Sequence, residues 1–433
     1  MRILRFIGFA LLGIIVFAAA LSVWGGSGTR LLMDATHVPP ATPGEDSPSA
    51  LPPPTLGLAN PYLKWRTKDG TRAGYSMAAA KAGHLRYAIQ HGVMDLQTGD
   101  PITPETRFRI ASMTKPITAA AAMILVERGK LDLDDPVADY IPAFANPRVW
   151  TPDGSEPAQR HPTLRDLLTF TAGIGSFNGT SRPALDTIWS EALSSHANTS
   201  DLETRVNAMA ALPLYNNPGD AWHYGSSLTV MARIIEIASG QSFEAFLTTE
   251  IFIPLGMSDT SFLPAPDQRD DIASLYTHND MGNLIQRPDP EFDLKGRVSG
   301  DGRLISTLPD YMRFALMLWN KGSYQGHQIL SEASITAMTT PHVTQGVLSE
   351  FDIEGLGWGF GLAITIDAKA TPMPDKMRDF FWSGVNGTHF WISPEDKTVF
   401  VYMTQYRAPA GETGRPRGAE IPFIVQALVN REL

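Results

Sequence analysis

The stretch IASMTKPITAAAAMILVERG, residues 110–129, is an apolar helix pattern with polar residues at its start. Alanine, isoleucine, methionine and leucine fill its later turns, as in a helix that is buried in a core. The first turn instead carries Ser112, Lys115 and Pro116. We expect a helix over 116–128, because proline is tolerated near a helix start. If the helix already ran from Ser112, Pro116 would remove the hydrogen bond to the Ser112 carbonyl and make this turn tight or irregular.

The spacing of Ser112 and Lys115 suggests a nucleophile with an activating amine. Residues three apart lie on one face of a helix, so the two side chains should point the same way. A serine hydroxyl is a weak nucleophile until a neighbouring group helps to remove its proton, and a buried lysine amine can take part in this. The helix start adds N–H groups and a positive field that favour an oxyanion. Alone, the pattern also fits an N-cap serine and a solvated lysine.

Composition limits the class of protein. The 433 residues are 43% hydrophobic and 18% charged, which suits one large or two small globular domains. The net charge is -10 and the pI is about 5.5, and no basic stripe stands out, so we expect no nucleic-acid partner. The absence of cysteine excludes disulfides, cysteine-type zinc sites, a cysteine nucleophile and a lipoprotein anchor. A chain without cysteine suits an oxidising or a reducing compartment equally well.

The N-terminal region has the pattern of an export signal. Two arginines precede an uncharged apolar run over residues 6–24. We interpret residues 1–25 as a signal peptide, with small residues for cleavage at 18–20, or as an uncleaved membrane anchor. A buried core helix is a third interpretation. Residues 26–59 are rich in proline, serine, threonine and glycine and predict an extended linker. The protein would then be exported, periplasmic or extracellular, with membrane contact only through its N-terminal segment.

The remaining residues, 60–433, predict one α+β domain. Strand-like runs lie at both ends, and the middle is mostly helical, so the terminal strands should share an antiparallel sheet flanked by helices, with a helical subdomain. The expected strands are two around a Lys-Ala-Gly turn within 74–99, and GWGFGLAITI, DFFWSGV, THFWISP and TVFVYMTQY after residue 355. The expected helices are 116–128, 164–170, 202–212, 228–239, 243–251, 309–319 and 421–433.

Longer stretches resemble the serine β-lactamase-related family, which includes class C β-lactamases, D-Ala-D-Ala carboxypeptidases and esterases of the same fold. The resemblance runs from about residue 74 to 404, and several segments occur in the family's order. These are residues 106–142 around Ser112 and Lys115, 162–174 with Phe170 where histidine is common, 216–262, 299–318 and 357–362. The resemblance implies a β-lactamase/transpeptidase-like fold and a serine hydrolase that forms an acyl-enzyme and needs no cofactor or metal.

The family's second motif, Tyr-x-Asn or Tyr-x-Ser, matches Tyr224-Gly225-Ser226. The resemblance makes Tyr224 a catalytic residue: near a protonated Lys115 its phenolate would take the Ser112 proton and return it to the leaving group. Ser226 would be a hydrogen-bond partner. Without the family context, Tyr224 is better interpreted as a core tyrosine with a satisfied hydroxyl.

The third motif departs from the lactamase pattern. Class C enzymes and carboxypeptidases have Lys-Thr-Gly or His-Thr-Gly, whereas this chain has Trp382-Ser383-Gly384, which resembles the family VIII carboxylesterases. Trp382 supplies no charge for a substrate carboxylate, so the motif favours neutral esters over anionic lactams. Gly384 permits close backbone approach, and the N–H of Val385 would form an oxyanion hole with that of Ser112. A half-buried strand aromatic remains the other interpretation of Trp382.

We therefore expect a carboxylesterase-type serine hydrolase that acts on a small-molecule ester or amide. One alternative is a β-lactamase or D-amino-acid peptidase of the same fold. The others are a non-catalytic cell-wall or peptide-binding module and a membrane-tethered structural protein. No Gly-x-Ser-x-Gly, HExxH or Walker motif is present, and no metal-ligand spacing stands out. His389 is expected to be structural, Gly300 and Gly302 to form a tight loop, and the oligomeric state is not indicated.

Overall fold

The computed structural model describes residues 59–175, 182–196, 201–288, 298–343, 354–371, 376–409 and 421–432. All of them belong to one compact unit, Val38–Leu433. The segment interpreted as a signal peptide or anchor, and the linker up to residue 58, lie outside these ranges and stay predictions. Within the described ranges, none of the helices combines the length and apolarity that crossing a membrane requires.

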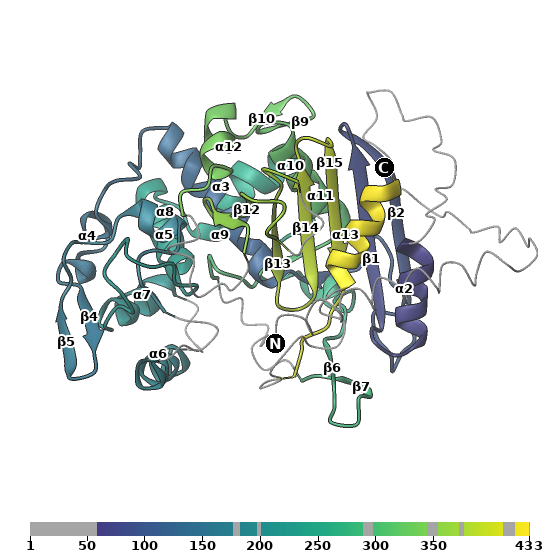
Figure 1. Ribbon diagram of the computed structural model, residues 1–433, viewed down its shortest axis with the longest axis horizontal. Helices are drawn as coiled ribbons and strands as arrows, with labels where there is room; N and C mark the ends of the chain where they lie inside the picture. Colours follow the sequence, from purple (N-terminus) through teal and green to yellow (C-terminus); the bar gives the residue numbers. More distant parts are fainter. Residues whose placement is uncertain are drawn as a thin grey trace, which may run out of the picture. The chain divides into compact units, whose positions relative to one another are not determined.

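A seven-stranded antiparallel sheet joins the two ends of the described chain (Figure 1). Its order is β11-β12-β13-β14-β15-β1-β2, and β1 pairs with β15 so that Met77 lies opposite Tyr402. The prediction that terminal strands share one sheet is therefore confirmed. The strands are β1 (Gly74–Lys81), β2 (His84–Gly92), β11 (Leu356–Trp358), β12 (Ala363–Thr365), β13 (Phe380–Gly384), β14 (Thr388–Ser393) and β15 (Thr398–Met403).

The described helices cover the sheet and form a separate group beside it; in Figure 1, α4 to α7 gather on the left. They are α2 (Ala59–Lys68), α3 (Thr114–Glu127), α4 (Val137–Tyr140), α5 (Leu164–Leu168), α6 (Pro183–Ser195), α7 (Leu202–Ala210), α8 (Ser227–Ser239), α9 (Phe243–Leu247), α10 (Ile253–Leu255), α11 (Leu308–Trp319), α12 (Glu332–Met338) and α13 (Ile421–Glu432). Helix α8 contacts α3, α5, α7 and α9, so it connects the helical subdomain to the helix after Ser112.

The two faces of the sheet carry different helices. Successive residues of a strand point to opposite faces. On β14, the ring of Phe390 lies 5.3 Å from that of Tyr311 on α11, whereas His389 contacts Gln426 on α13. Helix α11 therefore covers one face, and α13, which also contacts α2, covers the other. Antiparallel pairing places Trp382 opposite Phe390, so the third motif directs Trp382 toward the α11 face.

The structure corrects several predicted helices. Helix α3 begins at Thr114, with Pro116 in its first turn, and a 3₁₀ turn, η1 (Ala111–Met113), precedes it. The tight first turn is thus confirmed. The helix predicted over 243–251 begins at Phe243 as expected, but only its first part is α-helical: α9 passes into a π-helical turn, η3 (Thr248–Phe252), and then into α10.

Helices α2, α6 and α12 were not predicted. Helix α2 is rich in polar residues and buries only four side chains, so its sequence carries little apolar periodicity. The mostly helical middle also contains short two-stranded pairs. These are β3 (Phe108–Arg109) with β8 (Ile305–Ser306), β4 (Arg148–Thr151) with β5 (Gly154–Pro157), β6 (Tyr276–His278) with β7 (Leu284–Gln286), and β9 (Ser323–Tyr324) with β10 (His327–Gln328). Two further 3₁₀ turns are η2 (Pro142–Phe144) and η4 (Pro266–Gln268).

Candidate active site

Ser112 lies on a strained turn between β3 and α3. The preceding residue, Ala111, has φ of +46°, in the left-handed region that residues with a Cβ rarely adopt. Such strain persists only where surrounding contacts impose it, and it often marks functional sites. Here the Gln405 amide clamps Arg109, accepting from its N–H and donating to its carbonyl, both at 3.3 Å. These bonds hold the backbone three residues before Ser112, whose side chain is half-buried.

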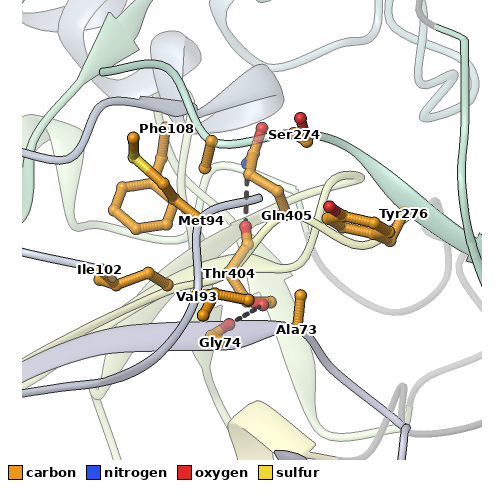
Figure 2. Close-up of a pocket in the computed structure, with 11 residues that line it drawn as sticks. Ala73, Gly74, Val93, Met94, Ile102, Phe108, Ser274, Tyr276, Thr404 and Gln405 are labelled. Atoms are coloured by element: carbon orange, nitrogen blue, oxygen red, sulfur yellow. Dashed lines mark hydrogen bonds between the residues drawn. The ribbon is translucent and has the colours of Figure 1, made fainter. Parts of the chain in front are cut away.

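The cavity in Figure 2 lies beside this clamp. Gln405 and Thr404 line part of it, and the Thr404 hydroxyl donates to the Gly74 carbonyl at 2.6 Å. Most of the remaining lining is apolar, including Ile102 and Phe108. None of the predicted catalytic residues lines the cavity, so it is not the candidate active site.

Lys115 is buried and touches Ser112. Its side chain is 1% exposed, and Nζ lies 3.1 Å from Ser112 Oγ and 2.6 Å from the backbone oxygen of Asp301. Nζ also lies 4.6 Å from the centre of the Tyr224 ring, within cation–π range. The alternative of a solvated lysine is therefore wrong. The structure brings together the hydroxyl, the amine and the phenol ring that the motifs predicted.

Tyr224 is positioned by a close approach of two loops. A Cβ on Gly225 would lie 2.0 Å from the Gly175 carbonyl oxygen, so only glycine fits there. Hydrogen bonds flank the tyrosine on both sides: the His223 N–H donates to Phe170 at 2.7 Å, and the Ser226 N–H donates to Ile174 at 2.9 Å. The backbone around Tyr224 is fixed by these contacts.

Ser226 is buried at the N-cap of α8. Its carbonyl accepts from the Thr229 N–H at 3.0 Å, and its side chain makes no capping hydrogen bond to the helix. The structure thus gives Ser226 a place at the start of α8. The predicted role of its hydroxyl toward substrate stays a prediction.

Trp382 faces Tyr224 from β13. Its indole N–H donates to the Tyr224 hydroxyl oxygen at 3.3 Å, and the rings meet edge to face at 5.5 Å. Trp382 is 6% exposed, so it is more deeply buried than the half-buried aromatic of the alternative interpretation. It belongs to a ring cluster whose other members are Phe170, Trp222, Tyr224 and Trp358.

Gly384 brings β13 against the segment before Ser112. A Cβ there would lie 2.3 Å from the Ile110 carbonyl oxygen, which also accepts from the Thr388 hydroxyl at 3.1 Å. Val385 follows in the turn to β14, with its side chain 56% exposed. Within the described ranges, no protein acceptor takes the backbone N–H of Ser112 or Val385. The oxyanion hole formed by these two N–H groups stays a prediction.

Asp301 is a site residue that the sequence motifs missed. Its buried carboxylate accepts from the N–H groups of Leu228 at 3.2 Å and Thr229 at 2.9 Å, and from the Thr229 hydroxyl. Burial raises the pKa of this carboxyl, while the charge of Lys115 and the hydrogen bonds oppose the rise. Its signal in the sequence is a single acid between Gly300 and Gly302, in the stretch that is predicted to form a tight loop.

The surroundings of His389 agree with the structural role that is predicted for it. It lies on the α13 face, fully buried, where its Nδ1 is 2.8 Å from Ser383 Oγ and its Nε2 is 3.3 Å from Gln426 Oε1. Burial lowers its pKa to about 4. In the part of the chain that the structure describes, no three histidine, aspartate or glutamate side chains gather as potential metal ligands.

The fold and this arrangement define a class. A sheet built from both chain ends, with a Ser-x-x-Lys helix on one face and a tyrosine from the helical subdomain, is the β-lactamase/transpeptidase-like fold of serine hydrolases. Residues 59–421 match the family model described as Beta-lactamase, which shows that this chain belongs to that family.

The relatives include esterases and penicillin-binding proteins. Esterase EstB from Burkholderia gladioli is 30% identical over 356 residues, which cover 77% of this chain and 86% of EstB. Penicillin-binding protein 4 from Amycolatopsis lactamdurans is 30% identical over 298 residues, covering 67% of this chain and 71% of the relative. The solved structure of EstCE1, a hydrolase with promiscuous acyltransferase activity, has a TM-score of 0.72 and 23% identity, covering 86% of this chain and 97% of its own.

Proposed function

We propose that this protein is a carboxylesterase-type serine hydrolase that forms an acyl-enzyme on Ser112. One observation carries the choice of ester: the third motif presents the uncharged indole of Trp382, hydrogen-bonded to Tyr224 at 3.3 Å. A cation at this position would attract the carboxylate of a lactam or a peptide terminus. The likeness to Esterase EstB supports the proposal.

The first half of the reaction forms the acyl-enzyme. Ser112 Oγ attacks the ester carbonyl carbon, and its proton passes to the Tyr224 phenolate. The Trp382 N–H donates to the oxygen of this base, and the Lys115 amine lies 4.6 Å from the centre of its ring. The carbonyl oxygen becomes an oxyanion, which the N–H groups of Ser112 and Val385 bind.

The second half releases both products. The tetrahedral intermediate expels the alcohol oxygen, which takes the proton from the Tyr224 hydroxyl and leaves as the alcohol. A water molecule then attacks the acyl carbon and gives its proton to the same phenolate. When the bond to Ser112 Oγ breaks, that oxygen recovers the proton and the acid departs. The same base serves both steps, so no cofactor enters the reaction.

The test compares substrates on one preparation. The full-length chain, purified in mild detergent, is assayed with p-nitrophenyl butyrate, with a chromogenic cephalosporin and with a fluorophosphonate probe. We expect ester turnover and labelling without lactam turnover, and loss of both in Ser112→Ala. Faster lactam than ester turnover would favour the β-lactamase alternative. If neither substrate is cleaved and no label is incorporated, a non-catalytic binding module is the better description.

We also propose that the protein is exported, because residues 2–24 combine arginines with an apolar run. Intact-mass analysis of the protein from the producing cell distinguishes the two forms. A chain that lacks about the first 20 residues supports a cleaved signal peptide. A full-length chain in the membrane fraction supports the anchor, and a full-length chain in the cytosol contradicts export.

A further inference from the structure

The Ile110 carbonyl closes the turn that carries Ser112. It accepts from the Met113 N–H at 3.0 Å, while the Ile110 N–H donates to the Leu304 carbonyl at 3.0 Å. The same Ile110 carbonyl accepts from the Thr388 hydroxyl at 3.1 Å. The two residues that form this bond are buried, with Ile110 0% and Thr388 1% exposed. The hydroxyl therefore bonds, away from water, to the acceptor that closes the strained turn.

Thr388 is fixed relative to Val385 by the hairpin that contains both. Gly384, the last residue of β13, pairs with Thr388, the first residue of β14. The Gly387 N–H donates to the Gly384 carbonyl at 2.9 Å and closes a β-turn over residues 384–387, in which Val385 is the second residue. Holding Thr388 in place therefore also holds the backbone N–H of Val385.

Gly384 leaves room for the bond between Thr388 and Ile110. A Cβ on Gly384 would lie 2.2 Å from Thr388 Oγ1 and 2.3 Å from the Ile110 carbonyl oxygen. Any side chain at this position would push the hydroxyl and the carbonyl aside. The close backbone approach and the hydroxyl hydrogen bond thus join the hairpin to the Ser112 turn at the same point.

The preceding carbonyl, that of Arg109, is held by two side-chain amides. Asn386 donates to it from the hairpin turn at 3.4 Å, and Gln405 donates to it at 3.3 Å. Two successive carbonyls, those of Arg109 and Ile110, thus accept from side chains of the hairpin. The Thr388 bond, at 3.1 Å, is the shorter of the two.

We propose that Thr388, assisted by Asn386, is a positioning residue that sets the spacing between the Ser112 and Val385 N–H groups of the predicted oxyanion hole. This inference rests on the proposed function and adds to it the side chains that hold the two halves of the hole together. The negative oxygen forms only during the reaction, so a hole with the wrong spacing lowers kcat more than it weakens substrate binding. Thr388 acts through the backbone and touches no substrate.

The test uses Thr388→Val in the full-length chain, because valine keeps the shape of threonine without its hydroxyl. The substrates are p-nitrophenyl butyrate and its thiono analogue, in which sulfur replaces the carbonyl oxygen. Sulfur accepts hydrogen bonds weakly, so the thiono ester gains less from the two N–H groups. We expect kcat per fluorophosphonate-labelled site to fall about 5- to 30-fold for the oxygen ester, with KM within about three-fold, and less than about three-fold for the thiono ester. A folded variant with the wild-type kcat and the wild-type ratio between the two esters overturns the proposal.

Two control variants separate positioning from stability. Thr388→Ser keeps the hydroxyl and should restore kcat and the ester ratio to within about two-fold of the wild type. Thr398→Val removes another buried hydroxyl, which donates to the Asp396 carbonyl at 3.3 Å where β15 pairs with Ser393, at the other end of β14. We expect it to lower thermal stability but to keep the ester ratio. An equal change of the ratio in Thr398→Val would show that Thr388 acts only through the stability of the sheet.

Asn386→Leu decides the question if Thr388→Val does not fold. It removes the donor to the Arg109 carbonyl together with a buried side-chain oxygen that has no hydrogen-bond partner among the described residues, so we expect folding to be retained. The ester ratio should move in the same direction as in Thr388→Val, by a smaller amount, and a wild-type ratio refutes the proposal.

The wild-type chain distinguishes failure of this inference from failure of the proposed function. If it hydrolyses the oxygen ester no better than the thiono ester, relative to the uncatalysed rates, there is no oxyanion hole for Thr388 to align and this inference fails. If it is neither labelled nor active on esters, the proposed function has failed instead.

Discussion

On each face of the β13–β14 hairpin a serine hydroxyl lies beside a side-chain nitrogen. On the α11 face, Ser112 Oγ lies 3.1 Å from the Lys115 amine, and on the α13 face, Ser383 Oγ lies 2.8 Å from His389 Nδ1. Ser383 and His389 with Gln426 even imitate a catalytic triad by distance. Yet His389 is fully buried, and the N–H groups available for an oxyanion lie on the Ser112 side. A short distance between a serine and a nitrogen therefore does not identify a nucleophile. Substrate must also be able to reach the serine, and N–H donors must lie where they can bind the oxyanion.

The largest expected effect separates the two serines directly. Ser112→Ala should reduce ester hydrolysis by at least about 1,000-fold and abolish fluorophosphonate labelling, because the acyl group has no oxygen to bind. Ser383→Ala should keep activity within about three-fold, because that hydroxyl faces α13. Steady-state kinetics and labelling of both variants check this. Activity that depends on Ser383 and survives loss of Ser112 would reverse the assignment of the two faces.

Tyr224→Phe should have the next largest effect. Loss of a general base reduces kcat by about 100- to 1,000-fold, with little change in KM. Tyr140→Phe is the control, since that hydroxyl bonds Asp135 at 2.6 Å in another part of the helical region. We expect the control to retain kcat. Stopped-flow measurement of the acylation burst locates the loss in Tyr224→Phe; a normal burst would show that another group takes the Ser112 proton.

Trp382→Phe tests the hydrogen bond that crosses from β13 to Tyr224. Phenylalanine keeps an aromatic ring but removes the indole N–H, so kcat should fall about three- to ten-fold. The same variant should not gain activity on a chromogenic cephalosporin, because it adds no charge. Parallel kinetics on ester and lactam measure both effects. Unchanged ester kinetics would show that Trp382 acts only as apolar surface.

The smallest effect on catalysis is expected at His389, where the change is in stability alone. Its folded-state pKa of about 4 lies below the ordinary 6.5, so the unfolded chain takes up a proton first as pH falls. The stability is therefore complete above about pH 6.5 and is lost between pH 6.5 and 4, by about 3 kcal/mol. His389→Gln should flatten this dependence in chemical denaturation at several pH values, with ester kinetics retained. If His389→Gln loses the same folding stability between pH 6.5 and 4 as the wild type, other groups cause this loss.

How far the sequence predicts the molecule differs between these regions. Helices with a strong apolar pattern, such as α3 and α8, and the pairing of the terminal strands followed from sequence, as did the meeting of Ser112, Lys115 and Tyr224. The contacts of Asp301 did not, because they come from two helices that are distant in sequence: Lys115 of α3 donates to its backbone oxygen, and the first turn of α8 donates to its carboxylate. The contact between Gln405 and Arg109 could not be predicted for the same reason, because the two residues are distant in sequence and meet only in the folded protein.

Helix α2 and the π-helical turn η3 show a second limit. The polar composition of α2 provides no periodic signal, and its position is decided by contact with α13 and β2. In η3, the backbone hydrogen bonds change from the α-helical to the π-helical spacing. The apolar pattern of residues 243–251 does not reveal this change. Tertiary contacts decide such elements, whereas local pattern decides α3 and α8.

The pairing of β1 with β15 has a consequence for how the protein is made. In this pairing, Ser76 lies opposite Met403. Gly384, at the end of β13, approaches the Ile110 carbonyl before Ser112 only after β13 has joined the sheet. Contacts between such distant parts of a chain form slowly, because a long loop must close first. In the proposed mechanism, a growing chain therefore contains Ser112 well before the strand that brings Val385 beside it has been made. We expect the oxyanion hole to be complete only after synthesis of the last strands, so that a chain ending before β13 would not hydrolyse esters.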